Sequence, residues 1–128
     1  MKKHILLLES EQGMERILTL LLKQANFRVS RCRKAESVLG GTDSGTSLFG
    51  GSDLMIIDMA ERGCEGSRLL RKLKAARSVP PMILITPYGN EALVERSDGP
   101  DSAIILYAPF ESAELMDCIA RAIDIKSD

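Results

Sequence analysis

Three polar side chains that could do chemistry each stand at the end of a short apolar run. Glu9 follows HILLL, Asp58 follows LMII, and Thr86 follows PMILI. Such runs are typical of buried strands, whereas a buried carboxylate or hydroxyl needs a polar partner. In open α/β folds, ligands and chemistry gather where the carboxyl ends of neighbouring parallel strands meet. Glu9, Asp58 and Thr86 therefore form one candidate site, although they are far apart in the chain.

Cysteine and histidine chemistry has little support in this chain. Its 128 residues include three cysteines, at positions 32, 64 and 118, and a single histidine, His4. The cysteines are widely spaced and form no Cys-x-x-Cys pair, which argues against a zinc site and against a disulfide scaffold.

The overall charge excludes partners that need a strong positive field. The chain has 17 lysines and arginines against 18 acidic residues, so we expect no direct contact with nucleic acid and none with a membrane surface. The apolar run that follows His4 is too short for a signal peptide or a membrane span. We expect a cytoplasmic location.

Five short apolar runs predict strands. Four are nearly continuous, as expected for strands that are buried on both faces of a parallel sheet. The second run alternates apolar and polar residues and is typical of an edge strand. The predicted strands cover residues 4–9, 27–32, 53–58, 81–86 and 102–107.

Helices are predicted between the strands, where apolar residues recur with a period near 3.6. In the first helix, the stripe expected to be buried is Met14, Ile17, Leu18, Leu21 and Leu22. Ser10 stands just before it and is expected to be its N-cap. Glycines between 40 and 51 limit the second helix to about 34–39, and the 98–100 turn shortens the fourth.

The alternation of strand and helix predicts a doubly wound α/β fold. We expect a five-stranded parallel sheet in the flavodoxin-like order 2-1-3-4-5, with helices on both faces. The second and fourth helices should be short or irregular. The length fits a single domain over residues 1–128.

Over essentially its whole length the sequence resembles the receiver domains of bacterial two-component response regulators, which are CheY-like. The matching segments are HILLLESE, DLMIIDMAERGCEG, PMILIT and YAPFESAEL, in the family's order and spacing. The resemblance implies that a histidine kinase passes a phosphoryl group to Asp58, with Thr86 contacting the phosphoryl oxygens. It also implies that Asp58, the Ala60 backbone carbonyl and two acids after the first strand hold Mg²⁺.

Four positions depart from the family pattern. Ser10 replaces the second acid, which leaves Glu9 as the other metal candidate and should weaken Mg²⁺ binding. Pro87 has no N–H to donate to a phosphoryl oxygen. Ala108 replaces a lysine, and Ile105 replaces the aromatic residue that commonly reorients in the family. We therefore expect a degenerate pocket, with weak or no phosphorylation at Asp58.

Structural roles for the same residues stay open. Glu9 and Asp58 could be remnants at strand ends, and the Thr86 hydroxyl could bond the backbone. The resemblance suggests a cis peptide bond before Pro109.

The predicted function is that of a signal-transduction receiver, acting through protein–protein interaction rather than as an enzyme. Its partner would be a histidine kinase, an output domain or a second copy, bound through helix 4, strand 5 and helix 5. The charged residues expected on that face are Glu111, Glu114, Asp117, Arg121 and Asp124.

Two alternatives remain. One is a competent Mg²⁺-dependent aspartyl phosphoacceptor, whose enzymatic activity would be self-phosphorylation and dephosphorylation at Asp58. The other, more distant, is a flavodoxin-like small-molecule binder. It would need a hydroxyl- and glycine-rich phosphate loop after the first strand, where this chain reads ESEQG.

Overall fold

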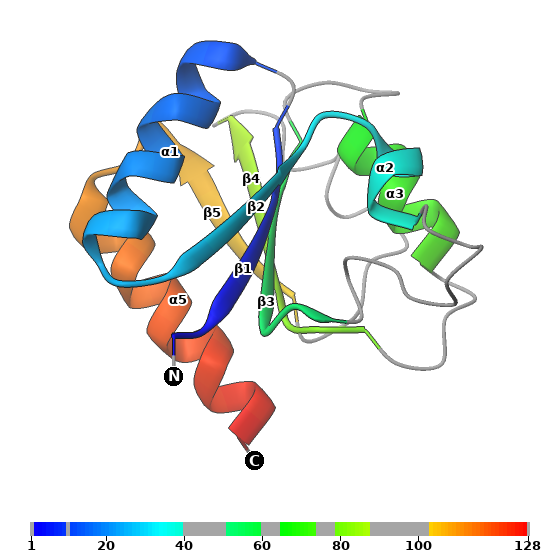
Figure 1. The fold of residues 1–128 in the computed structure, drawn as a ribbon. Coiled ribbons are helices and arrows are strands. Elements are labelled where there is room, and N and C mark those ends of the chain that lie inside the picture. Colours follow the sequence, from blue (N-terminus) through cyan, green and yellow to red (C-terminus); the bar gives the residue numbers. More distant parts are fainter. Residues whose placement is uncertain are drawn as a thin grey trace.

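A computed structural model describes residues 2–9, 11–39, 51–59, 65–73, 79–87 and 103–127. Within these ranges, five parallel strands form one sheet in the order β2-β1-β3-β4-β5, which confirms the predicted fold class and strand order (Figure 1). The strands are β1 (His4–Leu8), β2 (Arg28–Cys32), β3 (Leu54–Asp58), β4 (Met82–Pro87) and β5 (Ile104–Ala108).

Helices cover both faces of the sheet (Figure 1). They are α1 (Gln12–Gln24), α2 (Ala35–Leu39), α3 (Glu65–Leu73) and α5 (Ser112–Ser127). The short second helix is confirmed, whereas the predicted fourth helix and the glycine-rich 40–50 segment lie outside the described residues. In the described part of the chain, no helix is long and apolar enough to cross a membrane.

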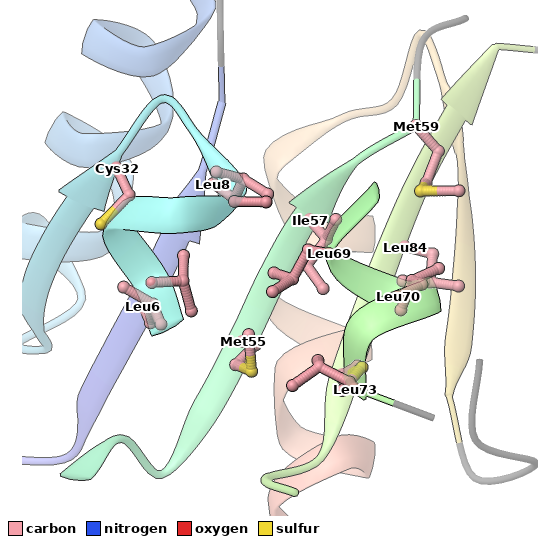
Figure 2. Close-up of a cluster of buried hydrophobic side chains, with 13 residues drawn as sticks. Leu6, Leu8, Cys32, Met55, Ile57, Met59, Leu69, Leu70, Leu73 and Leu84 are labelled. Atoms are coloured by element: carbon pink, nitrogen blue, oxygen red, sulfur yellow. The ribbon is translucent and has the colours of Figure 1, made fainter. Parts of the chain in front are cut away.

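The core consists of two clusters, one on each face of the sheet. In β1, Ile5 and Leu7 pack toward α1 and α5, while Leu6 and Leu8 pack toward α2 and α3. Figure 2 shows the second cluster, in which α3 contributes leucines that lie over β3. Because every residue of β1 from position 5 to 8 is buried, its sequence shows a continuous apolar run rather than alternation.

The predicted edge strand is confirmed. β2 lies at the margin of the sheet and pairs only with β1 among the described strands. Arg28 and Arg31 are exposed on it, and charged side chains of this kind disfavour pairing with another sheet edge.

The start of α1 differs from the prediction. Its N-cap is Glu11, whose carboxylate accepts hydrogen bonds from the backbone amides of Gly13 at 2.9 Å and Met14 at 2.8 Å. Assigning the cap to Ser10 was therefore wrong. A carboxylate at this position also interacts favourably with the positive end of the helix dipole.

The buried face of α1 also differs from the prediction. Ile17 was expected in the core but is 57% exposed, and Leu20 beside it is 59% exposed. The buried face instead contains Glu15 together with Leu18 and Leu22. Glu15 on this face pairs with arginines at the β2 edge, and hydrophobic periodicity does not detect such a pairing.

Candidate functional site at the carboxyl ends of the strands

The sheet register brings the predicted site residues to one edge. β1 and β3 pair in parallel up to Leu8 and Ile57, so Glu9 and Asp58 come next on adjacent strands. Asp58 lies opposite Ile85 of β4, one residue before Thr86.

Glu9 is almost completely buried, at 3% exposure. Its backbone amide donates to the Cys32 carbonyl at 3.0 Å, which extends the β1–β2 ladder by one residue. Its Oε2 atom accepts a hydrogen bond of 3.2 Å from the amide of Glu11. Both contacts fix the Glu9 carboxyl group at the site.

Glu9 and Asp58 form an interacting acid pair. Burial, followed by the negative charge of Asp58 and a side-chain hydrogen bond to it, raises the pKa of Glu9 from 4.5 to about 8. The Glu11 amide acts in the opposite direction and offsets only part of this rise in pKa. Below about pH 8 the pair is therefore stabilised by a proton on Glu9.

Thr86 is completely buried in β4. Its hydroxyl donates to the backbone carbonyl of Met59, the residue after Asp58, over a long distance of 3.5 Å. The contact agrees with the backbone-bonding alternative, but at this length it is weak.

Three of the four residues that depart from the family pattern lie on β4 and β5. Pro87 ends β4 and pairs with Ala108 of β5. The Ala108 methyl group packs against the α1–α5 cluster, and Ile105 packs against the α2–α3 cluster. Position 108 therefore contributes apolar packing in place of a cation. The Ala108–Pro109 peptide bond is cis, as predicted.

The predicted metal ligands are only partly described. Ser10 and Ala60 lie outside the described residues, so their positions are not tested. No group of three or more histidine, cysteine, aspartate and glutamate side chains that could hold a metal ion occurs within the described ranges.

Sequence reasoning missed two residues beside the site. Gly66, in the first turn of α3, packs directly on the backbone of Asp58. Glu65, just before it, contacts the first residue of α2. The feature of the sequence that could have revealed this contact is Gly66 itself, because glycine has a low intrinsic propensity for helices and still stands at the start of a helical pattern.

The family model of the response regulator receiver domain matches residues 5–120. The uncharacterized transcriptional regulatory protein YkoG of Bacillus subtilis (strain 168) is 30% identical over 124 residues, covering 95% of this chain and 51% of YkoG. The transcriptional regulatory protein FixJ of Bradyrhizobium diazoefficiens is 29% identical over 122 residues, covering 95% of this chain and 57% of FixJ. The chain thus spans about half the length of these two regulators.

A third relative matches from end to end. Sporulation initiation phosphotransferase F of Bacillus subtilis (strain 168) is 22% identical over 128 residues, covering 100% of this chain and 99% of that protein. Among solved structures, a CheY-like response regulator receiver domain protein from Methanospirillum hungatei JF-1 has a TM-score of 0.73 at 19% identity, covering 99% of this chain and 98% of that one. A response regulator receiver protein from Sinorhizobium medicae WSM419 has a TM-score of 0.74 at 22% identity, covering 96% and 95%.

Proposed function

The chain belongs to the response regulator receiver domain family, and we propose that it is an atypical, cytoplasmic bacterial member that signals by binding other proteins. In this proposal, phosphorylation at Asp58 is weak or absent. The observation that carries it is the acid pair, in which Glu9 hydrogen-bonds to Asp58 and has a pKa of about 8.

A phosphoacceptor site must neutralise the charge that phosphoryl transfer brings to it. Here Glu9 holds a proton below about pH 8, which makes it a poor ligand for the Mg²⁺ that would supply positive charge, and position 108 offers a methyl group in place of an ammonium. Pro87, next to the Thr86 hydroxyl, has no N–H to donate. Loss of one preorganised donor typically slows a reaction by about 10² to 10³. The three differences act in the same direction.

The residues present fit Mg²⁺ poorly. Mg²⁺ requires oxygen ligands in near-octahedral geometry and supplies positive charge to phosphoryl oxygens when it is bound. Glu9 and Asp58 would be its carboxylate ligands, yet they hydrogen-bond to each other, and position 10 carries serine in place of an acid. We therefore propose weak Mg²⁺ binding.

The proposed partners are a histidine kinase, an output domain or a second copy of the chain. The described part of α5 supports a polar contact face, because Glu114, Asp117 and Arg121 are exposed on it. Asp117 and Arg121 form an exposed ion pair of 3.3 Å, and such pairs contribute little stability, so they are available for an interface.

The second candidate function is a competent phosphoacceptor. It is favoured by the partial exposure of Asp58, which leaves its carboxylate reachable, and by end-to-end similarity to a protein named as a phosphotransferase.

Incubation with Mg²⁺ and acetyl phosphate, followed by intact mass measurement, separates the two functions. We expect no phosphoryl mass on the wild-type protein. The matched positive control is the triple variant Ser10→Asp, Pro87→Ala, Ala108→Lys, which restores the acid, the backbone N–H and the ammonium and should gain the mass. Adding Asp58→Asn to the triple variant should remove the mass. Wild-type labelling as fast as that of the triple variant would establish the phosphoacceptor instead.

The binding part of the proposal is tested with the same preparations. Analytical ultracentrifugation compares wild-type protein, Asp58→Asn and Asp117→Lys, alone and with a candidate kinase. We expect association to survive Asp58→Asn and to be lost in Asp117→Lys. Loss of association in Asp58→Asn alone would contradict the proposal.

A further inference from the structure

The first turn of α3 lies in direct contact with the backbone that carries Asp58. Gly66 is buried there, and a Cβ atom on it would collide with the Asp58 carbonyl oxygen. The same Cβ would also come within 2.8 Å of Ile57 Cγ2 and 3.0 Å of Met59 Sδ. Only glycine allows this approach, so the position of α3 is set by the end of β3.

The residue before Gly66 joins α3 to α2. Glu65 Oε1 accepts a hydrogen bond of 2.7 Å from the backbone amide of Ala35, the first residue of α2. That amide belongs to the first turn of a helix, where backbone donors have no partner within the helix. Glu65 therefore caps α2 from a neighbouring helix, at a separation of 30 residues in the chain.

Charged side chains reinforce this junction on the surface. Arg68 pairs with Glu65 at 3.1 Å and with Glu36 of α2 at 3.0 Å, and Lys72 lies 3.7 Å from Glu36. A backbone hydrogen bond lowers the pKa of the exposed Glu36, opposed by desolvation and assisted by the charges of Arg68, Lys72 and Lys34.

The buried sides of the two helices share one cluster. Ala35 and Val38 of α2 pack in the same cluster as Leu69 and Leu70 of α3. Figure 1 shows α2 beside α3, and Figure 2 shows the leucines of α3 over β3. The two short helices therefore form one unit that rests on the Asp58 backbone.

The two residues of β5 that depart from the family pattern offer no comparable polar link. Ile105 and Ala108 of β5 both pack in apolar clusters and have no polar tip that could follow a change at Asp58.

We propose that Glu65 is a positioning residue that couples α2 to the Asp58 backbone through Gly66, so that the α2–α3 surface responds to displacement at the site. A shift of the Asp58 peptide moves α3 through the Gly66 contact, and α3 carries the first turn of α2 with it through the Glu65–Ala35 hydrogen bond. The coupling needs no phosphoryl group, and it is independent of the function proposed above.

The cap itself is tested by amide hydrogen exchange at Ala35. In Glu65→Ala we expect exchange to accelerate on the order of tenfold, because a capping hydrogen bond is lost. Glu65→Gln keeps an acceptor oxygen and should restore slow exchange, whereas Arg68→Gln removes only the ion pairs and should leave exchange nearly unchanged. Equal exchange rates in wild-type protein and Glu65→Ala would overturn the proposal.

The coupling is tested by a double-variant cycle read from the backbone amide resonances of α2. Gly66→Ala displaces α3 and should shift the Ala35, Glu36 and Val38 resonances. In a Glu65→Ala background the same substitution should shift them clearly less, because only the ion pairs of Glu36 and the shared apolar cluster then join the two helices. Shifts of equal size in both backgrounds, or none in either, would refute the coupling.

If the Gly66→Ala variant does not fold, a milder substitution can be used to displace α3. Met59→Leu replaces the sulfur that faces Gly66 with a branched carbon and keeps the core apolar. Met59→Leu is compared in the wild-type and Glu65→Ala backgrounds, and the α2 amide shifts are judged by the criteria given for Gly66→Ala.

Discussion

Two buried glutamates near the same edge of the sheet are stabilised in opposite ways. Glu9, at 3% exposure, hydrogen-bonds to another acid, Asp58. Glu15, at 7% exposure, faces the arginines at 31 and 33, with ion-pair distances of 3.7 and 3.4 Å. Glu15 has cationic partners, whereas Glu9 is stabilised by a proton.

This difference agrees with the proposal that the pocket lacks a balancing cation. The acids at the ends of β1 and β3 remain adjacent, but position 108 on β5 carries a methyl group instead of an ammonium. Burial and the neighbouring charge of Asp58 raise the pKa of Glu9 to about 8. In the function proposed above, the pocket keeps its two acids and lacks the cation that would balance them.

The largest effect is expected from Glu9→Gln. A carboxyl group whose pKa is higher in the folded state binds its proton more tightly there. Its contribution to stability is therefore complete below about pH 4.5 and is lost as the pH rises through about 8. Wild-type protein should lose on the order of a few kcal/mol between pH 5 and 8 from this group. Glu9→Gln should lose far less and should be the more stable protein at pH 8.

Urea unfolding at pH 5, 6.5 and 8 in the presence of a chelator measures this effect. Asp117→Asn is the matched control, because it also removes one carboxylate but from an exposed pair. If Glu9→Gln keeps the wild-type decrease in stability with pH, a group other than Glu9 is responsible.

The proximity of Glu9 and Asp58 could be predicted from the sequence, because each acid stands at the end of a predicted strand. Continuous apolar runs located the strands, and parallel pairing then placed both acids at the same edge. What remained hidden was the protonation of Glu9, because it depends on burial and on the distance between the two carboxyl groups.

Other misses have local physical causes. Ser10 is the better N-cap by statistics, but the cap is decided by which side chain reaches the free amides, and Glu11 does. Ile17 fits the helical period, yet the buried face of α1 carries Glu15 with Leu18 and Leu22 and leaves Ile17 exposed. The close approach of Gly66 to Asp58 joins separate elements and leaves no periodic pattern.

A direct way to break the contrast between Glu9 and Glu15 is to give Glu9 a cation. In Ala108→Lys, an ammonium near the acid pair favours ionised Glu9, so its pKa should fall by about 1 to 3 units. The chemical shift of the Glu9 side-chain carboxyl carbon, followed by NMR from pH 4 to 10, measures this pKa. Ala108→Met is the control, since it adds length without charge. An equal shift in both variants would mean that packing, rather than charge, determines the pKa.

The smallest effect is expected where the charge is already balanced. Glu15→Gln leaves Arg31 and Arg33 without their carboxylate, and because both arginines are half exposed, the loss at pH 7 should be about 1 kcal/mol. The same substitution thus has opposite signs at the two buried positions at pH 8, stabilising at 9 and destabilising at 15. Urea unfolding at low salt and in 1 M NaCl measures the loss, which should shrink as salt screens the ion pairs. A loss that does not change with salt would mean that Glu15 contributes through packing and hydrogen bonding, and the contrast with Glu9 would no longer be one of charge.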